Sequence, residues 1–331
     1  MFDPIPLREP EIIFVSLEDG DFDIYGVSFD GSGYLNLTNN DFSDSDPVIS
    51  PNGDEIFYLS DNKLASMKIN GTNKKNLAVS RAVYSPVLSN SGEFIIFGDF
   101  SFKEGHEIDD IFKYDLATKE IINLTNGNLT SGNLENWYPC ISPDDKKIVY
   151  RVTLMSNATD TTFAEFNSEL FIMDSNGQNH FRLTSSDKYF TPIHPKFAKN
   201  SELVVFRRAR ELYMINSDGS NMAKIFPNRE YRCRKFKIHP DGERIIFAGS
   251  HHEDASHYTG IFSYQIATGE VREIITAMAP PYFVEFDISK NGDMIVYRYR
   301  QNLYRIDFDG SNSHRISNIY ELATDIYIRP F

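Results

Sequence analysis

The sequence predicts an all-β protein, a seven-bladed β-propeller made of four-stranded antiparallel blades. Three observations predict this fold class. A short apolar segment recurs seven times, three further segments recur around it, and the two chain ends each supply part of one repeat. A propeller accounts for all three, so we predict a single domain over residues 1–331.

The strongest repeated element is a short apolar segment, typical of a buried strand. It occurs as EIIFVS from Glu11, EIFYLS from Glu55, EFIIFG from Glu93, KIVYRV from Lys147, ELVVFR from Glu202, RIIFAG from Arg244 and MIVYRY from Met294. Every copy carries an aromatic residue at one equivalent position. We therefore expect a shared layer of core side chains, namely Phe14, Phe57, Phe97, Tyr150, Phe206, Phe247 and Tyr297.

Three further segments complete each repeat. A second segment ends in a turn, as in DIYGVSFDG, where an Asp-Gly pair supplies the positive φ that a tight turn requires. A third segment ends in Leu-Thr, as in YLNLT, and a fourth precedes the next repeat, as in DPVISPNG. Four short strands in a repeat of about 46 residues describe one antiparallel propeller blade.

The two ends of the chain are predicted to share one blade. The N-terminal part begins at the second strand of a repeat, and the C-terminal TDIYIRPF resembles the first strand of a repeat. We expect 325–331 to form the innermost strand of the blade whose outer strands begin at Glu11. This closure leaves no long unpaired edge.

The alternation of x-P-x-x-S-P-D-G, I-x-F, D-I-Y-x-x-D-x-D-G and L-T resembles the TolB-type propeller repeat, a WD-repeat-like unit, over essentially the whole chain. The resemblance implies the propeller fold. The same repeats occur in the periplasmic TolB protein, in the propeller half of prolyl-oligopeptidase-like peptidases and in oligogalacturonate lyase. This chain shows no G-x-S-x-G motif for a nucleophilic serine, and it resembles the lyase in size and blade number only.

Composition narrows the classes of function. The chain has 33 basic and 47 acidic residues, and its formal net charge of −14 opposes a nucleic acid backbone. No apolar run approaches the ~20 residues of a membrane span, and the N-terminus lacks the features of a signal peptide. The sequence as given predicts a soluble cytoplasmic protein. The TolB resemblance implies a periplasmic or secreted protein if the chain is a mature form.

Aligning the innermost strands places one residue per blade near the face where a propeller channel opens. These rim residues are Asp46, Ser85, Tyr138, His194, Arg234, Glu285 and Asp325. Interleaved acids and bases suit a zwitterionic or peptide-like ligand, with Arg234 holding a carboxylate beside Tyr231 or Tyr282. The alternative is a solvated rim without a ligand. Long loops are expected on the same face, over 98–110, 126–136, 152–169 and 248–260.

One dense histidine cluster suggests a second kind of site. His251, His252 and His257 lie close in sequence with carboxylates between them, and imidazole and carboxylate groups bind transition metals. The spacing is not that of a helical H-E-x-x-H site, so a solvated loop is the alternative.

The sequence favours a non-catalytic binding or scaffold module without a cofactor. Its partner would be a protein or peptide segment, or a small polar or glycan ligand. The alternative is a metal-assisted glycan-active enzyme similar in outline to oligogalacturonate lyase. In that case a divalent metal lies at the histidine cluster, and Arg229, Arg232 and Arg234 receive uronate carboxylates. Enzymatic activity is left open, because no catalytic motif is found.

Overall fold

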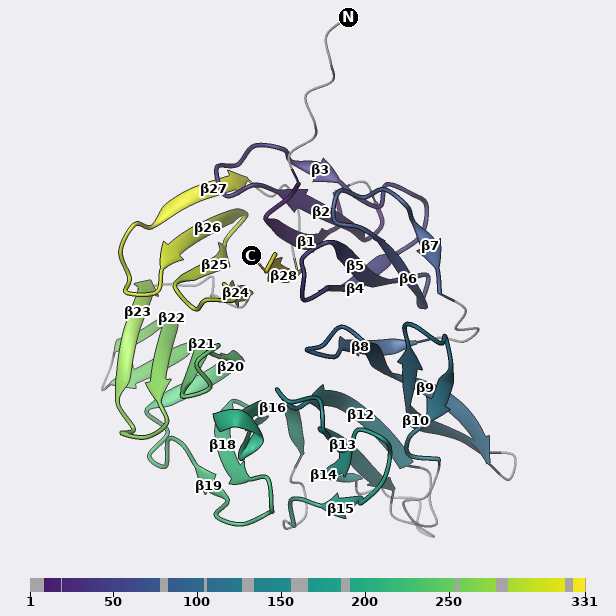
Figure 1. Ribbon diagram of the computed structural model, residues 1–331. Coiled ribbons are helices and arrows are strands. Elements are labelled where there is room, and N and C mark those ends of the chain that lie inside the picture. The colour runs from purple at the N-terminus through teal and green to yellow at the C-terminus, as the bar shows by residue number, and fades with distance from the viewer. Residues whose placement is uncertain are drawn as a thin grey trace, which may run out of the picture. The chain divides into compact units, whose positions relative to one another are not determined.

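The chain forms seven four-stranded antiparallel sheets, the blades of a seven-bladed β-propeller (Figure 1). The structure is a computed structural model. It describes residues 9–18, 20–77, 83–103, 106–126, 134–155, 166–185, 191–253, 256–277, 285–318 and 324–330. The predicted fold class is confirmed.

Two compact units make up the chain. Unit 1 comprises residues 1–80, 235–250 and 257–331, and unit 2 comprises 81–234 and 251–256. The single domain over 1–331 stays a prediction.

The blades are numbered in chain order, and the first strand of each blade is the segment that opens the repeat. Blade 1 contains β28 (Thr324–Ile328), β1 (Ile12–Ser16), β2 (Asp23–Val27) and β3 (Leu35–Asn36). Blade 2 contains β4 (Asp44–Ile49), β5 (Glu55–Ser60), β6 (Lys63–Lys68) and β7 (Lys75–Asn76). Blade 3 contains β8 (Tyr84–Leu88), β9 (Phe94–Lys103), β10 (His106–Asp115) and β11 (Ile121–Asn123).

The remaining blades have the same order of strands. Blade 4 contains β12 (Leu134–Ile141), β13 (Lys147–Met155), β14 (Phe166–Asp174) and β15 (Phe181–Arg182). Blade 5 contains β16 (Pro192–Ala198), β17 (Leu203–Arg208), β18 (Glu211–Asn216) and β19 (Ala223–Lys224), with the short 3-10 helix η1 (Lys199–Ser201) after β16. Blade 6 contains β20 (Tyr231–Ile238), β21 (Arg244–Glu253), β22 (Ser256–Gln265) and β23 (Val271–Ala277). Blade 7 contains β24 (Phe286–Ile288), β25 (Met294–Tyr299), β26 (Asn302–Asp307) and β27 (His314–Asn318).

Strand β28 completes blade 1, as the chain ends predict. It pairs antiparallel with β1, and Ile328 lies opposite Ile12. The backbone N–H of Ile328 donates to Asp287 Oδ2 of unit 1 at 2.7 Å, and that of Arg329 donates to the carbonyl of Glu11 at 2.8 Å. Figure 1 shows β28 beside β1, far from it in sequence. The closing strand is confirmed.

The second strand of each blade is apolar throughout because its two faces pack against different blades. In unit 1, Phe14 belongs to a buried cluster with Val296 of blade 7, and its neighbour Val15 belongs to a cluster with Ile56 of blade 2. Successive side chains of a strand point to opposite faces. A strand between two blades therefore has no solvent-facing side, which explains the continuous apolar run in the sequence.

The seven aromatic residues of the second strands are buried, as predicted. Their exposed fraction is 5% or less in every blade. In several blades the ring also stacks on an aromatic residue of the next strand, as Phe206 does on Tyr213 with ring centroids 5.6 Å apart. Such stacked pairs add to the stabilisation from buried area. The residues are core residues, and Phe14 and Phe206 each share a cluster with an adjacent blade.

Buried acids in three blades are bound by the threonine that ends the third repeat segment. In blade 1, Thr38 Oγ1 donates to Asp23 at 2.6 Å and accepts from the N–H of Ile24 at 3.0 Å. The same pair occurs as Thr125 with Asp110 and as Thr184 with Glu169. All three carboxylates belong to fully buried residues. The Leu-Thr ending of the repeat therefore satisfies a buried negative charge.

Replacing this threonine should destabilise a blade. We expect Thr125→Val to lower the free energy of unfolding by about 1–3 kcal/mol, because valine keeps the shape but leaves Asp110 and the N–H of Ile111 without the hydroxyl that binds both. Urea denaturation measures the change. Thr276→Val, at an exposed position of β23, is the control and should change stability by less than about 0.5 kcal/mol. Equal effects of the two substitutions would contradict the assignment.

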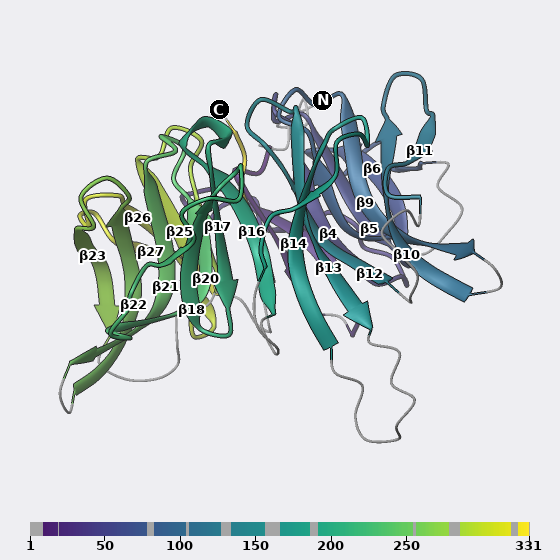
Figure 2. The same ribbon diagram turned by 90° about the horizontal axis from the view of Figure 1, so that it is seen from below.

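Two of the predicted long loops, 98–110 and 248–260, are largely strand, which corrects the expectation of loops there, while 156–165 and 127–133 of the other two lie outside the described residues. Strands β9 and β10 run to Lys103 and from His106, and β13 and β14 run to Met155 and from Phe166. Figure 2 shows the β9–β10 and β21–β22 extensions as two-stranded ribbons. The alternation of apolar and polar residues in FGDFSFK already favours a strand there. Among the described residues, no helix is long and apolar enough to cross a membrane.

Candidate functional site

The predicted rim residues coincide with a bulge that recurs in the first strands. In blades 1 to 5 the register between the first and second strands shifts at this point. The residue at the shift has a positive φ between 49° and 56° in each case: Asp46, Ser85, Tyr138, His194 and Asp325. A bulge takes one side chain out of the regular alternation of a strand. Five non-glycine residues in this costly conformation show that the fold fixes where these side chains lie.

The rim residues of blades 6 and 7 are placed differently. Neither Arg234 nor Glu285 has a positive φ. Arg234 lies within β20, and Glu285 directly precedes β24, where its carbonyl accepts the N–H of Arg298 at 3.0 Å. The rim residues divide between the two compact units: Asp46, Glu285 and Asp325 belong to unit 1, and Ser85, Tyr138, His194 and Arg234 belong to unit 2.

Unit 1 brings together the rim residues Asp46, Glu285 and Asp325, here called the acidic group. Asp325 interacts electrostatically with both other carboxylates. Lys235 forms an ion pair with Glu285, and Lys237 forms one with Asp287 at 2.5 Å. Neither lysine follows from the alignment of the repeats, although the alternation K-F-K in β20 places them on one face of the strand.

The carboxylates of the acidic group differ in their pKa shifts and in their ion pairs. Burial raises the pKa of Asp46 and of Asp325, and the charge of Asp46 raises the pKa of Asp325 further, while Lys235 and Lys237 oppose this rise. Burial and the neighbouring Asp325 also raise the pKa of Tyr327. The ion pairs of the lysines are made with Glu285 and Asp287, and within the described residues Asp46 and Asp325 have no ion pair of their own. Negative charge is therefore concentrated between these two carboxylates.

Removing one of these charges should stabilise the fold. The folded state raises the pKa of Asp325 above its ordinary value of 3.8, so stability falls as pH rises from 3.8 through the raised value. Asn carries no charge to desolvate, so Asp325→Asn should raise the melting temperature at neutral pH and leave it nearly unchanged below pH 3.8. Thermal unfolding at several pH values tests this. The exposed Asp61→Asn is the control, and a variant less stable than the parent at neutral pH would contradict the prediction.

Unit 2 brings together the rim residues Tyr138 and His194, whose ring centroids lie 4.6 Å apart. The guanidinium of Arg151 lies 5.0 Å from the centroid of Tyr138. The sequence analysis missed Arg151, because it comes from the second strand of blade 4. The ladder places it opposite Trp137, next to the bulge residue.

A second missed arginine lies near Arg234. The side chain of Arg207 donates from Nη1 to the backbone carbonyl of Arg234. Burial lowers the pKa of Arg207, and the positive charges of Arg210 and Arg234 lower it further. We call Arg151, Arg207, Arg210 and Arg234 the arginine group.

The ring of Tyr231 lies 4.9 Å from that of Phe226 and 4.5 Å from that of His251 between centroids. A role for Tyr231 beside Arg234 stays a prediction. Tyr282 lies outside the described residues.

The histidine cluster is only partly described. His251 lies in β21, is 7% exposed and packs on Tyr231. His252 and His257 lie in β21 and β22, and their side chains fall outside the described part of the structure. Among the described residues, no three His, Cys, Asp or Glu side chains are placed to hold a metal ion. A metal site at His251, His252 and His257 stays a prediction.

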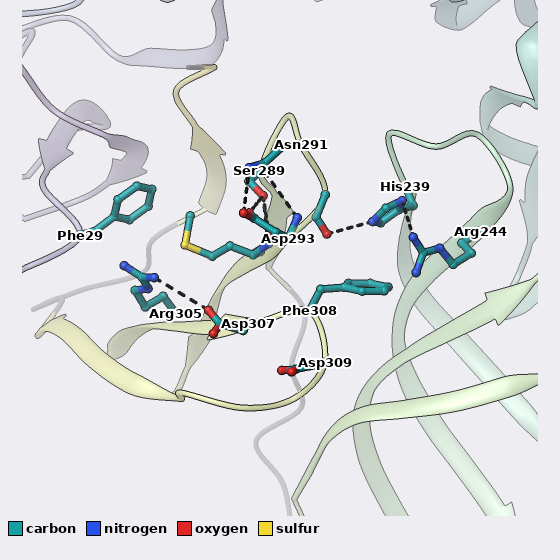
Figure 3. A pocket seen from close by; sticks show the side chains of 12 residues that line it. Phe29, His239, Arg244, Ser289, Asn291, Asp293, Arg305, Asp307, Phe308 and Asp309 are labelled. Carbon is teal, nitrogen blue, oxygen red and sulfur yellow. Dashed lines mark hydrogen bonds and ion pairs between the residues drawn. The ribbon is translucent and has the colours of Figure 1, made fainter.

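A cavity of about 650 Å³ lies in unit 1 among the turns of blades 6, 7 and 1 (Figure 3). It includes none of the predicted site residues. Arg244 pairs with Asp241 at 2.6 Å and lies 4.5 Å from the ring centroid of Phe308, and Arg272 lies 4.8 Å from the same ring. His239 Nε2 lies 2.9 Å from the carbonyl oxygen of Gly292. These groups join the turns of adjacent blades, so we assign the cavity lining to the scaffold.

Comparison with known proteins supports the fold assignment. The chain matches no protein-family model and no curated protein. Among solved structures it is similar to an oligogalacturonate lyase in complex with manganese, with a TM-score of 0.69 and 15% identity over 94% of this chain and 86% of that one. An oligogalacturonate lyase from Vibrio parahaemolyticus gives 0.67 and 14% over 94% and 87%. TolB from Acinetobacter baumannii gives 0.53 and 18% over 97% and 82%.

These likenesses show a shared β-propeller fold. The expected resemblance to TolB and to oligogalacturonate lyase is confirmed at the level of the fold. At 14% to 18% identity it assigns neither activity nor ligand, because one fold supports many functions.

Proposed function

We propose that the chain is a binding module that captures a protein segment or a small polar ligand through the rim residues of its first strands. The observation that carries this proposal is the pair Asp46 and Asp325. Both carboxylates are partly buried, both lie at bulge residues, and burial raises both pKa values. A cationic group placed between them would offset the cost of holding the two charges there.

The lysines of unit 1 support the choice of these two carboxylates. Lys235 and Lys237 neutralise Glu285 and Asp287, so the fold supplies cations to the neighbouring acids. Asp46 and Asp325 combine a strained backbone of positive φ with a partly buried carboxylate. Polar groups that cost stability and are nevertheless fixed by the fold are typical of binding sites.

A direct test uses a lysine-rich peptide and its glutamate-rich counterpart as probes. Fluorescence anisotropy of the labelled peptides should show binding of the lysine-rich peptide only. Asp46→Asn and Asp325→Asn should each weaken binding about tenfold, the size expected when a charge-assisted hydrogen bond is lost. Asp61→Asn, on the exposed surface, should leave binding unchanged.

This test separates binding from folding. Asp325→Asn is expected to stabilise the protein at neutral pH while it weakens binding, so a loss of binding cannot be assigned to unfolding. If the lysine-rich peptide binds the double variant as tightly as the parent, or does not bind the parent, the proposal is wrong.

A glycan-active enzyme is the second candidate, and the arginine group favours it. Guanidinium groups bind carboxylates, and the chain has the fold of a protein described as oligogalacturonate lyase in complex with manganese. Incubation with oligogalacturonate and manganese should then give an unsaturated product, and metal analysis of the purified protein should show a stoichiometric metal. Absence of both would exclude this candidate.

A further inference from the structure

We propose that the arginine group of unit 2 binds an oxyanion, the carboxylate or phosphate group of a ligand. In this group Arg151 lies 5.0 Å from the ring centroid of Tyr138, which packs on His194, and Arg207 interacts electrostatically with Tyr138, Arg210 and Arg234. The inference rests on the proposed function and names the ligand chemistry that unit 2 would recognise. All of these residues belong to unit 2.

The strand register places two of these arginines at equivalent positions in adjacent blades. Arg151 of β13 lies opposite Trp137, and Arg207 of β17 lies opposite Ile193. Each therefore sits beside the bulge residue of its own blade, Tyr138 or His194. The shared bulge directs the backbone of blades 4 and 5 in the same way at this point. The two guanidinium groups thus belong to one repeated arrangement.

Two members of the group have no acidic partner. The ion pairs of unit 2 join other residues, such as Arg182 with Glu169 and Lys224 with Glu211. Within the described part of the chain, no carboxylate forms an ion pair with Arg207 or Arg210. In a chain with a net charge of −14, two interacting arginines without an acidic partner are unexpected.

Like charges held together cost free energy that an anion would recover. Burial lowers the pKa of Arg207 most, Cys233 and Tyr138 oppose this fall, and the charges of Arg210 and Arg234 add to it. A guanidinium stays charged at neutral pH. An oxyanion between the arginines would neutralise this repulsion. An anionic group would therefore relieve the repulsion among the arginines of unit 2. A cationic group would relieve the repulsion between Asp46 and Asp325 of unit 1.

The donors suit an oxyanion. A guanidinium presents several N–H donors in one plane and binds carboxylate or phosphate through two parallel hydrogen bonds. Nη1 of Arg207 donates to the carbonyl of Arg234, which restrains the guanidinium before a ligand arrives. Fixing a donor in advance reduces the entropy lost on binding.

Titration calorimetry with inorganic phosphate and with citrate tests the inference on the full chain at low ionic strength. At least one probe should bind, and its affinity should fall as sodium chloride is added. Arg207→Gln and Arg151→Gln should each weaken binding about tenfold or more. Arg207→Lys keeps the charge but loses the planar fork, and it should also weaken binding. Lys146→Gln removes an exposed positive charge from the same β12–β13 hairpin and should have no effect.

The two probes distinguish the source of the oxyanion. Binding of phosphate alone assigns a phosphorylated ligand, and binding of citrate alone assigns a carboxylate ligand. Failure of both probes, or equal binding by the parent and the folded Arg207→Lys variant, overturns the inference. The lysine-rich peptide is measured on the same variants. If it still binds the acidic group while both anions fail, the proposed function stands and this inference alone is wrong.

Discussion

Deleting residues 324–331 should abolish cooperative folding. The deletion removes β28, the first strand of blade 1, and leaves β1 with an unpaired edge. It also removes Ile326 and Ile328, which are 1% and 7% exposed and belong to the core cluster of blades 1 and 7. An apolar edge without its partner strand favours aggregation. Thermal unfolding followed by circular dichroism should show no cooperative transition, and gel filtration should show aggregates.

Two controls make the deletion informative. Ile326→Val keeps the strand and should cost only about 0.5–1.5 kcal/mol. The peptide TDIYIRPF, added in excess to freshly refolded truncated protein, should restore part of the transition by pairing with β1, because a free strand edge accepts an added strand. A truncated protein with the melting transition of the full chain would show that β28 is dispensable.

The closing strand was predictable because short segments at the two chain ends match defined parts of the repeat. TDIYIRPF matches the first segment of a repeat, and the chain begins at a second segment, so the pairing of β28 with β1 follows from the repeat alone. The burial of the aromatic layer follows in the same way. Length alone misled the prediction of loops over 98–110 and 248–260, where extended hairpins continue the strands.

The candidate site was predictable only in part because the charged residues that approach the rim residues belong to other strands. Alignment of the repeats finds the bulge residues, and the proline after four of them marks the position. It does not find Lys235, Arg151 or Arg207, since their approach to the rim residues depends on strand register and on packing between blades. A sequence repeat shows which features the blades share. Which charged side chains of different strands lie close together is seen only in the structure.

Phe206→Ala should lower the free energy of unfolding by about 3–5 kcal/mol, the usual cost of truncating a buried phenylalanine. Phe206 is fully buried and belongs to a cluster with Val149, Ile172 and Phe197, which come from blades 4 and 5. Its ring also stacks on Tyr213 with an angle of 14° between the planes. Alanine therefore leaves a cavity at the contact of two blades and removes an aromatic pair. Urea denaturation gives the change in unfolding free energy.

The size of this loss tests whether the layer packs between blades. Phe181→Ala, on β15 of the same unit and 39% exposed, is the matched control, and we expect it to cost less than about 1 kcal/mol. Phe206→Leu restores most of the volume without the ring and should fall between the two, because the cavity shrinks while the stacking on Tyr213 is lost. A loss below about 1 kcal/mol for Phe206→Ala would mean that neighbouring side chains fill the space. The aromatic layer would then not be what holds blades 4 and 5 together.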